Sequence, residues 1–368
     1  MESNGICLRT NKGEYYQNET IYGVVYLCIK KHVPSKGLRL KIRGFEKAEF
    51  VYQYTTSEHT ASSRESVSIH YGKRCSRRDI IQAEYKLIDY PGGFPVGAYS
   101  YPFQYTLPDN LPGVYFQQGP GQSWEACVKY FIKAELEVTG DTDPLTCEEP
   151  VVIYGHTTAS EEATPEEYHS SDSVKTFCCI PRGDVNITAK LSKVAFTTGQ
   201  KAFVHIEIAN QSAVEIRSFV LKLIRVIKLY AKDNQRNEEH MREHVVIDTV
   251  AQSFHSGCKN NSSVNCGIPI LLADITDTET LLFPPTTKGT SLSCHYVVDL
   301  DMHVPWAPAV EMHLPLIVKP STNILWNNWT APGWTKECKT APVVDTCVVT
   351  PDIIASDVFH SLPGFESS

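Results

Sequence analysis

Hydrophobic and polar side chains alternate with a period of two along several segments of the chain. In residues 128–138 the apolar side chains take one set of alternate positions and charged side chains take the other: Val128, Tyr130, Ile132, Ala134, Leu136 and Val138 against Lys129, Lys133, Glu135 and Glu137. Residues 295–304 repeat this pattern, with Tyr296, Val298, Leu300, Met302 and Val304 against His295, Asp299, Asp301 and His303. Successive side chains of a strand point to opposite faces, so both segments are predicted to be half-buried strands.

The same series of strand-like segments occurs twice. Residues 19–29, 40–43 and 130–138 resemble residues 200–210, 221–224 and 296–304 in the same order. A repeat of this length predicts two tandem domains, because the units of a solenoid recur every 20–50 residues or so. Many strands separated by Gly, Pro, Asn and Asp turns predict an all-β fold of two antiparallel β-sandwiches.

These patterns divide the chain into four parts. We predict an N-terminal β-sandwich over residues 1–155, an acidic linker over 156–174, a C-terminal β-sandwich over 175–320 and a tail over 321–368. Within the second domain, Asp233–His244 is the one stretch with a helical composition. The tail carries Trp326, Trp329 and Trp334, so it either packs back on the body or docks on a partner.

Composition limits the classes of function. The net charge of −8 argues against general attraction to nucleic acid. The first residues lack the apolar core of a signal peptide, and no run of about 18 apolar residues occurs, so we expect a cytoplasmic protein. In that compartment the 12 cysteines are expected as thiols, and several, such as Cys28 and Cys127, fall inside strand patterns.

The order and spacing of short motifs resemble those of the α-arrestins, the arrestin domain-containing proteins, over about residues 4–320. In the first copy the resemblance rests on Tyr-Gly-Val-Val-Tyr at 22–26, Gly-Leu-Arg-Leu-Lys-Ile-Arg-Gly at 37–44, and the segments 97–108 and 128–136. In the second copy it rests on Phe-Cys-Cys at 177–179, Thr-Gly-Gln-Lys at 198–201, Phe-Pro-Pro at 283–285, and the segments 208–212 and 314–317.

The resemblance implies a non-enzymatic adaptor in membrane-protein trafficking. Such a protein binds cytoplasmic tails of receptors or transporters and links them to ubiquitination, endocytosis or endosomal sorting, at the plasma membrane and at endosomes. Relatives often recruit HECT-type ubiquitin ligases through Pro-Pro-x-Tyr motifs. This chain has none, since Pro284-Pro-Thr-Thr287 lacks the tyrosine, and Lys319 stands where the family usually has glycine. Recruitment of such a ligase therefore stays open.

Two groups of cations are candidates for binding these tails. Arg39, Lys41 and Arg43 alternate with apolar residues, so one face of their strand is predicted to be basic. A second cluster follows at Lys73, Arg74, Arg77 and Arg78. The resemblance implies a cradle for acidic or phosphorylated segments. An ordinary solvated sheet face is the equal alternative.

Two other classes of function remain open. A thiol-based redox binder, similar to thioredoxin-interacting protein, would need an exposed reactive cysteine, and Cys258 in a polar segment is the best placed. A zinc hydrolase would use His240, Glu243 and His244, which match H-x-x-E-H and would share a helix face. A zinc knot would combine Cys178, Cys179, His255, Cys258 and Cys266, but adjacent strand residues face opposite sides. We expect no metal and no cofactor.

Overall fold

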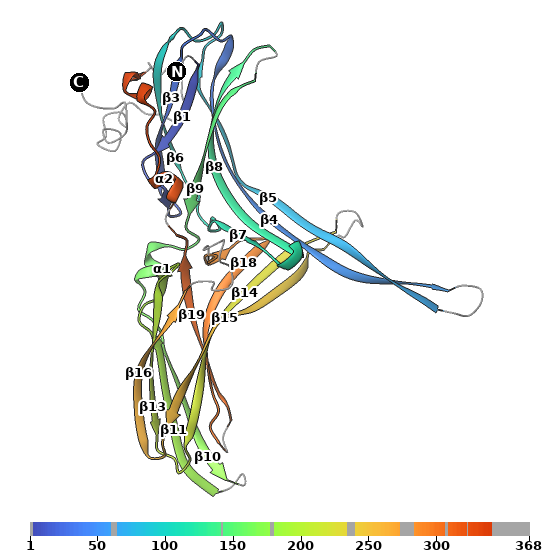
Figure 1. Cartoon of the computed structure of the whole chain (residues 1–368), viewed down its shortest axis with the longest axis vertical. Helices are drawn as coiled ribbons and strands as arrows, with labels where there is room; N and C mark the ends of the chain where they lie inside the picture. Colours follow the sequence, from blue (N-terminus) through green and yellow to red (C-terminus); the bar gives the residue numbers. More distant parts are fainter. Residues whose placement is uncertain are drawn as a thin grey trace.

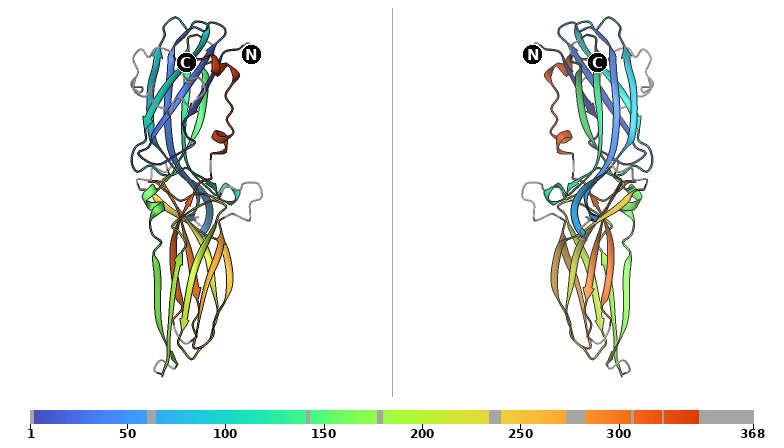
Figure 2. Two further views of the ribbon diagram at one scale, coloured as in Figure 1. Left: turned by 90° about the vertical axis from the view of Figure 1, so that its left-hand side faces the viewer. Right: turned by 90° about the vertical axis from the view of Figure 1, so that its right-hand side faces the viewer.

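Two β-sandwiches lie end to end along the long axis of the molecule (Figures 1 and 2). The computed structural model describes residues 3–59, 65–140, 143–176, 180–233, 240–272, 283–305, 308–321 and 323–340. Most strand pairs of the described residues are antiparallel, and β12–β19, β2–β9 and β20–β6 are parallel. The two arrays of sheets confirm the predicted all-β fold class with two tandem domains. No helix of the described residues is long and apolar enough to cross a membrane.

The N-terminal domain consists of two sheets. The first contains β1 (Gly5–Thr10), β3 (Thr20–Ile29), β6 (Gly97–Thr106) and β20 (Lys339–Thr340), in that order. The second has the order β2 (Glu14–Tyr15), β9 (Leu145–Ile153), β8 (Trp124–Val138), β4 (Ser35–His59) and β5 (Glu65–Asp89), and β7 (Tyr115–Gln118) also pairs with β8.

The C-terminal domain repeats this plan. Its first sheet has the order β10 (Glu167–Thr176), β11 (Ile180–Leu191), β13 (Lys201–Asn210) and β16 (Ser262–Leu271). Its second sheet has the order β12 (Ala195–Thr197), β19 (Val310–Lys319), β18 (Leu292–Met302), β14 (Ile216–Ala231) and β15 (Arg242–Cys258), and β17 (Thr287–Lys288) also pairs with β18.

The strands that the sequence repeat matched occupy equivalent places in the two domains. β4 lies between β5 and β8, and β14 lies between β15 and β18. The match extends to one buried hydrogen bond in each domain. The Tyr130 hydroxyl on β8 donates to the Pro112 carbonyl at 2.7 Å, and the Tyr296 hydroxyl on β18 donates to the Pro284 carbonyl at 2.5 Å. Each hydroxyl thus ties the proline-containing segment that precedes β7 or β17 to the strand with which β7 or β17 pairs.

Alternation along the strands fills the cores. On β4 the side chains of Leu38, Leu40 and Ile42 are buried, and on β8 those of Ile132 and Leu136 are buried. Full burial of each large aliphatic side chain stabilises the fold by roughly 1.5–3 kcal/mol. The charged residues between these positions therefore lie on the opposite, outer side of the sheet.

Two sequence expectations about irregular segments are corrected. The predicted linker 156–174 contains the short helix α1 (Thr158–Glu162) and most of β10, which pairs with β11. β10 is a polar edge strand, so it lacks the apolar alternation that reveals other strands. Of the predicted helix Asp233–His244, residues 234–239 lie outside the described residues, and Arg242–His244 begin β15. Pairing with β14 overrides the helical propensity of this charged segment.

The described part of the tail packs back on the N-terminal domain. It contains α2 (Ile324–Asn327), the 3-10 helix η2 (Gly333–Glu337) and β20, and it runs along one side of that domain (Figure 2). The Arg9 guanidinium lies 3.7 Å from the centre of the Trp326 ring and 4.9 Å from that of Trp329, and it donates to the Trp326 carbonyl at 2.6 Å. Arg9 is therefore one polar anchor of α2, beside the hydrogen bonds that Trp326 Nε1 donates to Thr10 and that the Asn323 N–H donates to Glu14.

Replacing Arg9 with alanine is expected to loosen the tail without unfolding the domain. The variant loses the cation–π contacts and one hydrogen bond, together about 1–3 kcal/mol. Amide hydrogen exchange in residues 323–340 should rise at least fivefold. Arg217→Ala, at an exposed arginine of β14, serves as the control and should leave this exchange unchanged. Equal exchange in the two variants would contradict the anchoring role.

Candidate partner-binding surface

The side of the second N-terminal sheet that points away from the core carries charged and aromatic side chains on β4, β5 and β8. We call it the outer face and define it by Arg39, Lys41, Arg43, Phe45 and Lys47 of β4 with their cross-strand neighbours. Lys41 lies opposite Glu84 on one side and Lys133 on the other, and Arg43 lies opposite Gln82 and Phe131. The sequence placed the first three cations on one face, and the structure brings them together there.

The three predicted cations of β4 are half-buried, and each has an acidic partner. Arg39 pairs with Glu137 at 3.1 Å and Asp89 at 3.6 Å, Lys41 pairs with Glu135 at 3.1 Å, and Arg43 pairs with Glu84 at 3.4 Å.

The ion pairs with lysine lower the pKa values of two carboxyl groups on the outer face. Burial alone would raise the pKa of Glu135, but hydrogen bonds from Lys41 and Lys133 outweigh it and hold that pKa below the usual value. Hydrogen bonding to Lys47 lowers the pKa of Glu125 in the same way. An acidic ligand therefore has to exchange existing cross-strand ion pairs for its own.

The second cationic cluster is divided between the two faces of β5. Lys73 pairs with Glu49, and the Arg77 guanidinium lies 4.1 Å from the centre of the Phe45 ring, so both lie on the outer face. Arg74 and Arg78 occupy the alternate positions and point to the other side. Arg74 stacks on Tyr52 at 3.5 Å, and Arg78 donates to the Thr290 hydroxyl of the C-terminal domain at 2.5 Å.

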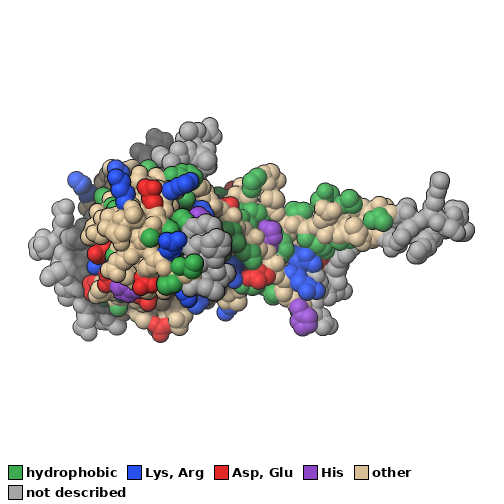
Figure 3. Space-filling model, turned by 90° about the horizontal axis from the view of Figure 1, so that it is seen from below, with side chains coloured by type: hydrophobic (Ala, Val, Ile, Leu, Met, Phe, Trp, Pro, Cys, Tyr) green, Lys and Arg blue, Asp and Glu red, His purple; other side chains and the backbone are tan. Residues whose placement is uncertain are grey.

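Beyond Tyr52, whose hydroxyl still donates to Asp233 of the C-terminal domain at 2.6 Å, the β4–β5 hairpin projects away from both domains (Figure 1). Val67, Ile69 and Tyr71 on its β5 strand have exposed fractions of 62%, 58% and 71%. They alternate with polar residues and share the outer face with Lys73. Figure 3 shows hydrophobic side chains gathered along this projection, with Lys and Arg side chains beside them. Exposed apolar side chains in one row are typical of interaction surfaces.

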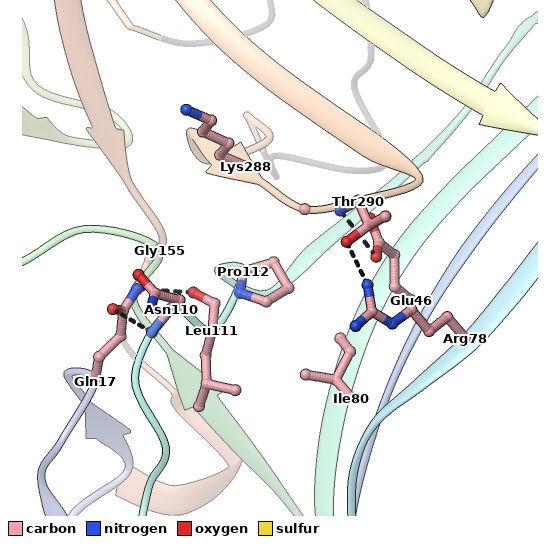
Figure 4. A pocket seen from close by; sticks show the side chains of 11 residues that line it. Gln17, Glu46, Arg78, Ile80, Asn110, Leu111, Pro112, Gly155, Lys288 and Thr290 are labelled. Atoms are coloured by element: carbon pink, nitrogen blue, oxygen red, sulfur yellow. Dashed lines mark hydrogen bonds between the residues drawn. The ribbon is translucent and has the colours of Figure 1, made fainter.

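On the opposite side of β4 a buried carboxylate joins the domains. Glu46 is 1% exposed and accepts hydrogen bonds from three successive backbone N–H groups, those of Thr290 at 3.2 Å, Ser291 at 2.6 Å and Leu292 at 2.8 Å. Figure 4 shows the first of these bonds. A cavity of about 370 Å³ lies beside this contact, with Arg78 and Lys288 in its wall. We call Glu46 and residues 289–292 the domain seam.

The domain seam was not predicted from the sequence, although the position of Glu46 gave one indication of it. Glu46 occupies a position on β4 where alternation places apolar residues, between Ile42 and Ala48. A charged residue in such a position is either strained or fully hydrogen-bonded. The structure shows the second case, with the partners supplied by the other domain.

Comparisons with known proteins agree with this architecture. Residues 5–158 match the family model described as "Arrestin (or S-antigen), N-terminal domain", and residues 181–323 match "Arrestin (or S-antigen), C-terminal domain". The chain belongs to the arrestin family. This confirms the resemblance to the α-arrestins and the two arrestin domains.

Two curated relatives of this chain are also named as arrestin domain-containing proteins. Arrestin domain-containing protein A of Dictyostelium discoideum is 21% identical over 85% of this chain, and arrestin domain-containing protein 15 of Caenorhabditis elegans is 25% identical over 68%. The matches span 50% and 66% of those relatives, respectively. Proteins of the arrestin family are in general adaptors that bind partner proteins rather than enzymes.

The redox candidate of this arrestin is not exposed, which corrects the expectation for Cys258. The thiol is 2% exposed at the end of β15 and contacts the Ser262 carbonyl at 3.2 Å and the Ser262 hydroxyl at 3.3 Å. The loop between β15 and β16 is polar, but it is short and folds the thiol inward. Of the other described thiols, burial raises the pKa of Cys147 to about 11 and that of Cys338 to about 12, which lowers their nucleophilicity at neutral pH.

The zinc motif does not have its expected geometry. His244 and Glu243 are successive residues of β15, so their side chains point to opposite faces. The His244 ring stacks on Phe50 at 5.0 Å, and Glu243 accepts from the Tyr230 hydroxyl at 2.9 Å. His240 precedes the strand, so the two histidines do not share a helix face.

The zinc knot is not assembled in the described part of the chain. Cys178 and Cys179 lie outside the described residues, and His255 stacks on Phe219. Among the residues that the structure describes, no three His, Cys, Asp or Glu side chains are grouped so as to hold a metal ion.

A buried polar cluster where the two domains meet gives a prediction about pH. Glu161 of α1 accepts from the Tyr16 hydroxyl, from His156 Nε2 and from Lys319 Nζ, each at 2.7 Å. Burial lowers the pKa of His156, although the contact with Glu161 opposes this. Unfolding returns the imidazole to a pKa near 6.5, so the unfolded chain binds more protons and stability falls as the pH drops through about 6.5.

We expect the melting temperature to fall between pH 7.5 and pH 5.5, and to fall less in His156→Gln, which keeps a donor toward Glu161 but does not titrate. His244, His255 and His295 also have lowered pKa values because of burial, and they contribute equally in both proteins. The difference between the two melting curves therefore isolates His156. An equal fall in melting temperature in the wild type and in His156→Gln would show that burial of His156 does not govern the sensitivity to acid.

Proposed function

We propose that this arrestin is a non-enzymatic cytoplasmic adaptor that binds acidic or phosphorylated segments in the cytoplasmic tails of membrane receptors or transporters. The observation that carries the proposal is the outer face, which extends from Arg39 along β4 and β5 to the projecting hairpin with its exposed Tyr71. Cations set among aromatic rings bind anionic groups and apolar side chains together. An extended segment of the ligand would lie along the strands of this face.

The adaptor would act at the cytoplasmic side of the plasma membrane and of endosomes, bound there through its cargo. It would link that cargo to ubiquitination or sorting, with HECT-type ubiquitin ligases as candidate partners through contacts other than Pro-Pro-x-Tyr. Of the seven cations singled out in the sequence, we assign ligand binding to Arg39, Lys41, Arg43, Lys73 and Arg77. Arg74 and Arg78 are assigned to holding the hairpin and the seam, because their side chains already contact Tyr52 and Thr290.

Reversing the charge of Arg39, Lys41 and Arg43 to glutamate tests this proposal. The triple variant should bind a fluorescent acidic or phosphorylated peptide at least tenfold more weakly, about 1.4 kcal/mol, because three cations are lost and three anions gained. The affinity of the wild-type protein should itself fall as salt is raised from 50 to 300 mM, because salt screens the attraction between the peptide's charges and these partly exposed cations.

A matched control keeps the net charge equal. Lys190, Lys201 and Lys259 are exposed lysines of the C-terminal domain, and their reversal to glutamate changes the total charge by the same amount. This control should retain wild-type affinity. Unchanged binding in the outer-face variant, or equal weakening in both, would reject the outer face as the binding surface.

A further inference from the structure

An apolar groove of about 540 Å³ opens beside the outer face. Its N-terminal-domain walls include Val114, Phe116, Phe131 and Val152, and its C-terminal-domain wall includes Pro284 and Pro285. The lining is mainly hydrocarbon, and proline supplies no N–H donor. A volume of this size is typical of specific ligand sites, which span roughly 300–1,000 Å³.

The groove arises from a break in strand pairing. β9 pairs with β8 at residues 130–136, and β7 pairs with the same edge of β8 at residues 125–128. Lys129 lies between the two paired stretches, where neither strand covers β8. The loop Phe283–Pro285 of the C-terminal domain crosses this point, so the groove exists only where the two domains meet.

The charge around the groove is suited to an anionic neighbour. The Lys129 ammonium lies 5.2 Å from the centre of the exposed Phe116 ring and forms no ion pair with a described residue. Phe131 in the groove wall lies directly opposite Arg43, and Lys129 lies opposite Phe45. Glu148 is the acidic side chain in the lining, and it lies opposite Lys133. The apolar groove therefore adjoins the cations of the outer face at a distance of about one strand spacing, roughly 4.8 Å.

We propose that the groove receives one or two large apolar side chains of the cargo segment that binds the outer face. The preferred cargo is then an extended segment in which an aromatic or large aliphatic residue stands next to acidic or phosphorylated residues. The apolar side chain enters between Phe131 and Pro285, and the neighbouring anion reaches Lys129 or Arg43, because successive residues of an extended chain advance by only about 3.3 Å. This inference rests on the proposed function and adds the class of sequence that is recognised.

Three synthetic 12-residue peptides separate the two contributions. The first carries four aspartates around a central Phe-Leu pair, the second replaces that pair with Ser-Ser, and the third keeps Phe-Leu but replaces the aspartates with asparagine. We expect fluorescence anisotropy to show the first peptide binding at least tenfold more tightly than either of the others. In Phe131→Ser the advantage of the first peptide over the second should disappear.

Two further variants distinguish loss of the groove from loss of folding. Val114→Trp fills the groove from the other wall and should reduce the same advantage, while Phe203→Ser, at a half-exposed aromatic of β13, should leave it unchanged. Circular dichroism and melting curves confirm that each variant is folded.

The outcomes distinguish this inference from the proposed function. Equal, salt-sensitive binding of the first two peptides would overturn the groove as a specificity site and leave the cationic outer face intact. Binding of none of the three would overturn both. A loss in Phe203→Ser equal to that in Phe131→Ser would also reject the groove.

Discussion

Replacing Glu46 with alanine is expected to destabilise the protein by about 3 kcal/mol or more, one of the two largest effects that we predict. The side chain is buried and satisfies three N–H groups of the other domain, two of which, on Ser291 and Leu292, belong to fully buried residues. A buried donor left without an acceptor costs about 1–3 kcal/mol. Calorimetry should therefore show a lower melting temperature and a partial separation of the transitions of the two domains.

The residue facing Glu46 permits a double-mutant cycle. A Cβ atom placed on Gly289 would lie 2.1 Å from Glu46 Oε1, so Gly289→Ala forces the carboxylate out of its position. Gly289→Ala should be destabilising alone and close to harmless when combined with Glu46→Ala, because the clash is then absent. Glu125→Ala, on the outer face, is the control for loss of a carboxylate. Additive effects of the two seam substitutions would show that Glu46 does not hold the turn 289–292.

Truncation of Tyr130 or Tyr296, the equivalent tyrosines of the two domains, should destabilise the protein by a similar amount. Tyr130→Ala and Tyr296→Ala each remove a buried ring and its hydrogen bond to Pro112 or Pro284, and large-to-alanine changes of aromatic core residues cost about 3–5 kcal/mol. Denaturant unfolding should show that each variant destabilises its own domain first.

The phenylalanine variants isolate the hydroxyl groups. Tyr130→Phe and Tyr296→Phe keep the packing and should each cost about 1–2 kcal/mol, because a buried carbonyl loses its donor. Burial raises the pKa of both hydroxyls, so they remain protonated donors across the physiological range. Two phenylalanine variants as stable as the wild type would show that the repeated hydrogen bond is incidental.

Much of the fold follows from local rules that the sequence displays. The alternation at 128–138 and 295–304 identified β8 and β18, and the repeat identified their equivalence, because one-sided burial imposes a period of two. The predicted linker over residues 156–174 and the predicted helix at residues 242–244 were wrong because these segments lack a clear period of two. β10 has polar Ser170 and Asp172 between Tyr168 and Val174 on its core-facing side, which obscures the alternation, and residues 242–244 pair with β14 as a strand.

The candidate site was predictable only in part. Arg39, Lys41 and Arg43 were placed on one face correctly, because alternation within a strand requires no tertiary information. Their partners Glu137, Glu135 and Glu84 lie on other strands, and the strand register that brings them together is not written in either segment alone. The domain seam and the groove depend on contacts between domains, which alternation within one strand does not encode. Burial of Cys258 likewise results from how its hairpin packs.

Proximity labelling in intact cells tests the central claim most directly, with the wild-type protein compared with the variant in which Arg39, Lys41 and Arg43 are replaced by glutamate. The account predicts that the wild type labels integral membrane proteins with cytoplasmic tails, together with ubiquitination or sorting factors. It also predicts that labelling of the membrane proteins falls at least severalfold in the variant. A labelled set without membrane proteins, or one that is the same for both proteins, would contradict the account.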